Sequence, residues 1–137
     1  EAEKIFIDEI TWQDPKVITK LNHLVQWIIE IGDTEGAKED LFRVERAAHA
    51  LPPPAIMLPK PQRIQSGKNV RLYCLRISSH IVILFNGGVK TNNDPTRCPN
   101  VSRHFYNAVS WSNQINRLNI RTKGKDIIDI HTIKLKP

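Results

Sequence analysis

Two apolar segments that lie close together give the clearest structural signal in the chain. Apolar residues dominate Val70–Ile77, with Arg71 and Arg76 between them, a pattern typical of a strand with one buried and one partly exposed face. The second segment, Ile81–Phe85, is apolar throughout, which indicates a strand in the middle of a sheet. Because only three residues separate the segments, we expect an antiparallel hairpin.

Two glycines follow the second apolar segment directly. Asn86, Gly87 and Gly88 lack the strand-to-helix arrangement of a phosphate-binding loop. We therefore expect them to end the strand as a turn or bulge, where the backbone bends or a ligand approaches closely.

Helical periodicity of apolar residues marks three further segments. The first begins at Asp14 and Pro15, a capping residue followed by a residue suited to the first helical position, and ends at Gly32. A second helix is expected over Ala37–Ala50 and a third over Ser102–Asn119, with its first residue as the N-cap. The short connection between the first two helices predicts a helical hairpin that packs across a sheet.

The remaining segments complete a single α+β domain over residues 1–137. Strands are expected at 3–10 and at 126–136, the latter after a turn at 122–125. The proline-rich segment 52–62 reads as an extended connector, with a ligand for aromatic-lined peptide-binding domains as the alternative. The expected fold is a small, mostly antiparallel sheet packed by an N-terminal helical hairpin and a later third helix.

The charge of the chain favours a polyanionic partner. Lys and Arg total 20 against 14 Asp and Glu, which gives a net charge of +6 and a pI near 9.6. Asp94 is the single acidic residue between Lys60 and Lys125. This asymmetry predicts one basic functional face that binds nucleic acid. The alternative is a solvated basic surface without a ligand.

The sequence lacks the motifs of several common classes of protein. The two cysteines, Cys74 and Cys98, make a poor disulfide framework, so we expect free thiols in a reducing cytoplasm. Together with His80 and His104 they match no metal-binding spacing, and no serine has the setting of a hydrolase nucleophile. We expect no metal, no cofactor and no membrane span; the sequence begins at Glu1, so a removed leader stays open.

A set of cations and imidazoles remains as the candidate site. Metal-free RNA cleavage needs a base for the 2′-hydroxyl, a cation for the phosphorane and an acid for the departing 5′-oxygen, and these side chains can supply all three. The alternative is that they coat a surface or hold phosphates without cleaving them. The set comprises Lys60, Arg63, Lys68, Arg71, Arg76, His80, Lys90, Arg97, Arg103, His104 and His131.

The central part of the chain resembles a known family. The basic strand Arg71–Arg76, the apolar run Ile81–Phe85, and Lys90 with Thr91 ahead of a helix together resemble the RelE/HigB-like toxins of bacterial type II toxin–antitoxin pairs. The resemblance implies a RelE-like fold and endonucleolytic cleavage of mRNA on the ribosome without metal, which inhibits translation. It also implies neutralisation by a cognate antitoxin protein that wraps the basic face.

The resemblance also implies roles for individual residues. Arg71 and Arg76 would be phosphate and transition-state cations, Lys90 a phosphate-binding or base-positioning cation, and His104 or His131 the general acid or base. The expected RNA-binding residues are Lys60, Arg63, Lys68, Arg97 and Arg103. Two alternatives are a non-catalytic basic module of the same fold that binds nucleic acid or protein, and a purely structural interaction domain.

Overall fold

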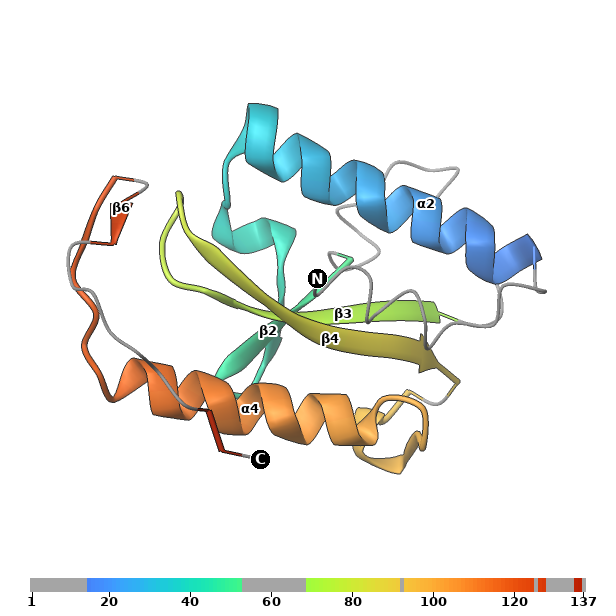
Figure 1. The fold of residues 1–137 in the computed structure, drawn as a ribbon. Coiled ribbons are helices and arrows are strands. Elements are labelled where there is room, and N and C mark those ends of the chain that lie inside the picture. The colour runs from blue at the N-terminus through green and yellow to red at the C-terminus, as the bar shows by residue number, and fades with distance from the viewer. Residues whose placement is uncertain (1–14, 53–68, 92, 125, 128–134, 137) are drawn as a thin grey trace.

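The described part of the chain is a four-stranded antiparallel sheet between two helices. The computed structural model describes residues 15–52, 69–91, 93–124, 126–127 and 135–136. Helix α2 covers one face of the sheet and helix α4 the other (Figure 1). The strand order is β1-β2-β3-β4, which confirms the expected α+β class and the antiparallel sheet. The elements are α2 (Pro15–Glu30), β1 (Arg43–Glu45), β2 (Ala48–Leu51), β3 (Asn69–Arg76), β4 (Val82–Lys90) and α4 (Ser102–Asn116).

Helix α2 confirms the first predicted helix. It begins at Pro15, and its buried Val17, Leu21 and Leu24 pack toward the sheet. The helical backbone does not end at Gly32 but continues as a π-helical turn to Gly36, whose φ of 74° lies in the left-handed region that favours glycine. The turn carries the chain off the helix and toward the sheet.

The predicted second helix over Ala37–Ala50 is wrong. A short 3-10 turn over Glu39–Leu41 leads instead into the hairpin of β1 and β2. Ala48 and Ala50 are fully buried in the core under α4, while the residue between them is only half-buried. This alternation suits a strand, and packing against β3 therefore overrides the helical propensity of the alanines. The described residues accordingly contain no helical hairpin.

The predicted hairpin of the two apolar segments is confirmed by the pairing of β3 with β4. The prediction that the second strand lies in the middle of the sheet is not borne out within the described strands, because β4 pairs only with β3 there. Strand β4 is nevertheless apolar, since side chains of α2 and α4 cover its two faces. Burial of both faces, rather than a central position, accounts for its sequence.

The glycine-containing segment lies inside β4 and does not end it. The pairing shifts by one residue opposite Tyr73, so that Phe85 and Asn86 form a β-bulge. A Cβ atom on Gly88 would lie 2.7 Å from the carbonyl oxygen of Asn100. The close approach expected at the glycines is therefore made by the chain's own loop before α4.

Helix α4 confirms the third predicted helix with different ends. Val101 occupies the N-cap position, Ser102 is the first helical residue, and the helix ends at Asn116 rather than Asn119. Its buried Phe105 and Ala108 face the sheet. None of the helices in the described ranges is long and apolar enough to cross a membrane.

The last described elements are two short antiparallel strands, β5 (Thr122–Lys123) and β6 (Asp126–Ile127). The predicted turn at 122–125 begins too early, because β5 occupies its first two residues; Gly124, which follows β5, has a φ of 58°. The expected strand at 3–10, nearly all of the connector 52–62 and most of the strand 126–136 lie outside the described residues.

The alternation of β3 decides which core each of its side chains enters. Leu72 and Cys74 belong to the core under α2, whereas Tyr73 and Leu75 belong to the core under α4. Odd-numbered β3 residues therefore point toward α4 and even-numbered residues toward α2. The two arginines of this strand, Arg71 and Arg76, lie on opposite faces of the sheet.

Candidate functional site

Arg71 is a buried charged residue whose guanidinium is only partly hydrogen-bonded within the described part of the chain. It lies on the α4 face of β3 and is only 6% exposed. Its Nη1 donates a hydrogen bond to the carbonyl oxygen of Val70 at 3.3 Å. Its Nε is buried and has no hydrogen-bond partner within the described part of the chain. A buried guanidinium with an unused donor is costly without a ligand, and it is therefore a candidate anion-binding group.

Four polar or charged side chains on the α4 face lie close enough to Arg71 to interact with it electrostatically. Lys90 lies on this face because it is two residues from Gly88, which pairs with Arg71. On the other side of β3, pairing across β2 places Arg43 and Glu45 on the same face. We call this set the Arg71 cluster; it consists of Arg43, Glu45, Arg71, Tyr73 and Lys90.

The cluster carries more positive than negative charge, with three cations against the single carboxylate of Glu45. Burial, followed by repulsion from Arg43, lowers the pKa of Arg71 to about 10. Arg71 therefore keeps its charge at neutral pH. Burial, followed by repulsion from Arg71, also lowers the pKa of Lys90. Burial is thus the main cause of both shifts, and an added anion would offset the repulsion that contributes to them.

Tyr73 adds a neutral hydrogen-bond donor to the cluster. Burial raises the pKa of its phenol, and the Glu45 carboxylate raises it further. The hydroxyl is buried and lacks a hydrogen-bond partner among the described residues. Tyr73 and the Nε of Arg71 thus offer two unused polar groups in one cluster.

A buried thiol supports the end of β4 beside the cluster. The Sγ of Cys98 accepts a hydrogen bond from the Thr91 backbone at 3.3 Å and lies 3.7 Å from the carbonyl oxygen of Val89. These contacts hold the loop before α4 against the strand that carries Lys90. Cys74 is buried on the other face, where burial raises the pKa of its thiol to about 12. Neither thiol forms a disulfide bond within the described residues.

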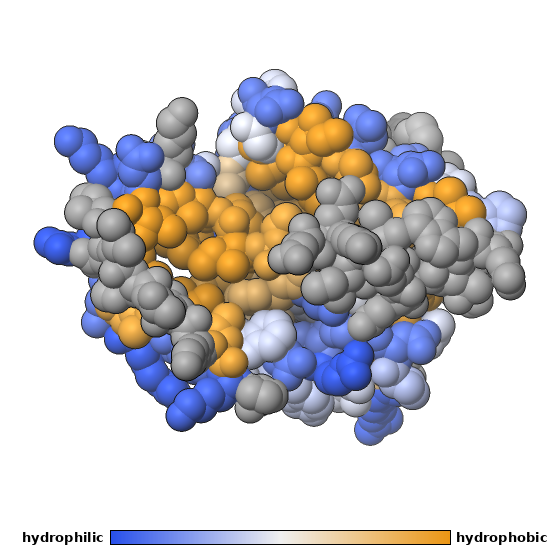
Figure 2. Space-filling view, viewed as in Figure 1, coloured by the Kyte–Doolittle hydropathy of each residue, from blue (hydrophilic) through white to orange (hydrophobic). Residues whose placement is uncertain are grey.

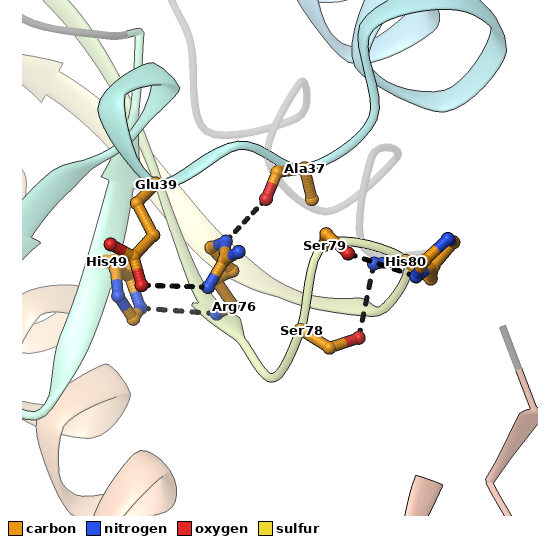
Figure 3. Close-up of polar contacts among 7 residues, drawn as sticks. All are labelled: Ala37, Glu39, His49, Arg76, Ser78, Ser79 and His80. Carbon is orange, nitrogen blue, oxygen red and sulfur yellow. Dashed lines mark hydrogen bonds and ion pairs between the residues drawn. The ribbon is translucent and has the colours of Figure 1, made fainter. Parts of the chain in front are cut away.

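Arg76 has a different environment on the α2 face (Figure 3). Its Nε donates a hydrogen bond to the carbonyl oxygen of Ala37, and its Nη1 lies 3.6 Å from Glu39. Its backbone N–H donates to Nδ1 of His49 at 3.2 Å. Groups of the protein thus bind the Arg76 guanidinium. Arg76 does not lie together with Arg71.

His49 was missed by the sequence analysis because it lies in the segment assigned to a helix. It is half-buried, and its ring lies edge-on to Phe42, with 6.0 Å between the ring centroids. Burial lowers the pKa of His49, and the nearby Arg76 lowers it further. Arg43 and Glu45 were missed for the same reason, and Tyr73 was assigned only to the core. The alternation of Ala48, His49 and Ala50 was the signal that indicated a strand.

The other predicted site residues are dispersed. His104 is buried in the first turn of α4, and Arg97 and Arg103 are exposed. His80 is exposed in the turn after β3, with its Nδ1 3.0 Å from the Oγ of Ser79 (Figure 3). The structure does not describe the remaining four residues, Lys60, Arg63, Lys68 and His131.

An apolar cleft lies on the α2 side of the sheet. Its volume is about 370 Å³, and Figure 2 shows apolar residues gathered on the surface between the two helices. The polar contribution to its lining comes mainly from Ser79 and His80. The lining consists of Ile28, Ile31, Gly32, Ala37, Phe42, Leu51, Ser79, His80, Val82 and Leu84. The cleft lies on the face opposite the Arg71 cluster.

Comparison with known proteins does not identify a function for the chain. No family model, no curated protein and no solved structure matches the chain. Within the described ranges, no group of three His, Cys, Asp or Glu side chains is placed to bind a metal ion together.

Proposed function

We propose that the chain is an endoribonuclease of the RelE/HigB-like toxin type and that the Arg71 cluster is its active site. The observation that carries the proposal is that the Nε of buried Arg71 has no hydrogen-bond partner among the described residues, while Arg43 and Lys90 lie on the same face and Glu45 is the carboxylate of the cluster. A phosphate group in the cluster would accept hydrogen bonds from these donors and offset their mutual repulsion.

The proposed reaction is a transesterification within the RNA. The 2′-oxygen attacks the adjacent phosphorus, and the bond from phosphorus to the 5′-oxygen breaks. Glu45 takes the proton of the 2′-hydroxyl, and Lys90 protonates the departing 5′-oxygen. The lowered pKa of Lys90 makes it a stronger acid for this step. Arg43 and Arg71 stabilise the phosphorane charge, and the products are a 2′,3′-cyclic phosphate and a 5′-hydroxyl.

The biological setting follows from the family resemblance. In this proposal the fold is RelE-like, the substrate is translated mRNA on the ribosome in the bacterial cytoplasm, and a cognate antitoxin blocks the basic face. The α+β architecture and the net charge of +6 support this setting. The proposal keeps Arg71 and Lys90 as site residues and assigns Arg76 a structural role.

Cleavage of end-labelled mRNA, free and on programmed ribosomes, tests the proposal. Free RNA is incubated in chelator, and mass spectrometry identifies the new termini. The wild-type chain should yield cyclic phosphate and 5′-hydroxyl ends. Arg71→Met and Lys90→Met should each lower the cleavage rate about 100-fold, whereas Lys123→Met, at an exposed position in β5, should not.

Two results would contradict the proposal. If the wild-type chain binds RNA in a salt-dependent way and leaves every strand intact, the chain is a non-catalytic binding module. If Arg71→Met and Lys90→Met cleave at the wild-type rate, the active site lies elsewhere.

A further inference from the structure

An arginine and an exposed aromatic ring lie together at the surface beside the Arg71 cluster. Arg46 occupies the turn between β1 and β2 and is exposed. Its Cζ lies 5.1 Å from the centroid of the Phe105 ring and 6.0 Å from that of Tyr106. Phe105 is buried, whereas Tyr106 is 50% exposed. A large aromatic surface is thus left in solvent next to a guanidinium, which is the composition of a base-stacking platform.

The platform is continuous with the proposed active site. The rings of Tyr73 and Phe105 meet edge to face with 6.0 Å between their centroids. Phe105 in turn meets Tyr106 with a centroid distance of 5.4 Å. Arg46 also follows Glu45 directly in the chain. Aromatic contacts therefore lead from the Arg71 cluster to the surface.

Two exposed arginines and one carboxylate, which interacts electrostatically with Arg46, lie on or just before the helix that carries Tyr106. Arg103 is exposed one helical turn before Tyr106 on α4, and Arg97 is exposed in the preceding loop. Arg97 lies 3.6 Å from Asp94, the single carboxylate of this stretch. Positive charge beside an exposed ring is complementary to a nucleotide, which carries a phosphate and an aromatic base.

We propose that Arg46 and Tyr106 form a stacking site for one nucleobase of single-stranded RNA, next to the phosphate held by the Arg71 cluster. This inference rests on the proposed function and adds to it a site that binds a base, beside the site that binds a phosphate. The bases of a duplex are stacked on one another and cannot lie on a protein ring, so the site selects single strands. Stacking is tolerant of sequence because every base has an aromatic face.

Binding of two short RNA analogues tests the site. The first is a fluorescent ten-nucleotide 2′-O-methyl strand, which cannot be cleaved because it lacks the 2′-hydroxyl proton. The second has the same phosphates but abasic sugars. The wild-type chain should bind the strand with bases about tenfold more tightly than the abasic strand. Fluorescence anisotropy measures both dissociation constants.

Substitutions at the exposed ring separate stacking from phosphate binding. Tyr106→Leu should bind both strands equally, while Tyr106→Phe should keep the wild-type preference. Arg71→Met should weaken binding to both strands by the same factor, since it acts on the phosphate. Unchanged thermal midpoints would show that the Tyr106 variants are folded.

The outcomes distinguish this inference from the function on which it rests. If Tyr106→Leu keeps the tenfold preference for bases, the stacking site is wrong while the Arg71 cluster stands. If the wild-type chain binds neither strand, the proposed function fails and the stacking site fails with it.

Discussion

The two arginines of β3 lie on opposite faces of the sheet and have different environments. On the α2 face, Arg76 contacts the Ala37 carbonyl and the Glu39 carboxylate. On the α4 face, Arg71 is more deeply buried, yet its Nε has no partner among the described residues and Arg43 is a repulsive neighbour. Groups of the protein therefore bind the guanidinium of Arg76, whereas the guanidinium of Arg71 is left with an unused donor among the described residues. An arginine that the fold does not satisfy is the better candidate for binding a ligand.

The largest expected effect is on stability. Arg76→Met leaves the buried carbonyl of Ala37 without its donor and should lower the free energy of unfolding by about 1–3 kcal/mol. Arg71→Met removes a buried charge and keeps the apolar stem, so it should be neutral or stabilising. Guanidinium chloride unfolding of both variants measures the difference. An equal loss in the two variants would make Arg71 a structural arginine like Arg76.

A smaller effect concerns pH on the α2 face. Neutral His49 accepts the Arg76 backbone N–H, and its pKa is lowered by burial and Arg76, with Glu39 opposing. The folded state therefore binds fewer protons at His49 than the unfolded state, whose pKa is about 6.5. This contribution to stability is complete above that pH and is lost as the pH falls through the lower, folded pKa.

Urea unfolding at pH 7 and pH 5 tests this contribution. The wild-type chain should lose more stability on acidification than His49→Gln, in which no imidazole titrates at this position. His80→Gln, at an exposed turn position, serves as the matched control and should behave like the wild type. Identical pH dependence in His49→Gln and the wild type would show that the contact with Arg76 does not depend on the charge of His49.

The sequence predicted those elements whose periodicity was unambiguous. The apolar spacing of α2 and α4 and the paired apolar runs of β3 and β4 gave the type and approximate position of these elements, but not their ends. The segment 37–50 failed because its alanines favour a helix in isolation, whereas the core under α4 has room only for small side chains at alternate positions. Helix propensity depends on the local sequence alone and does not include this packing against α4.

The separation of the two arginines was already present in the sequence. Arg71 and Arg76 are five positions apart, and an odd spacing along a strand places side chains on opposite faces. The charged neighbours of Arg71 were not predictable in this way. Arg43 and Glu45 reach its face only through the register of β1, β2 and β3, and register depends on long-range pairing rather than on local pattern.

Thermal unfolding with inorganic phosphate at constant ionic strength tests the central claim, that the Arg71 cluster is an anion site completed by a ligand. A ligand that binds only the folded state raises the midpoint as its concentration rises. The midpoints of the wild-type chain and of Arg76→Met should rise with phosphate, and that of Arg71→Met should rise much less. An equal rise in all three proteins would contradict the claim, because phosphate would then act without Arg71.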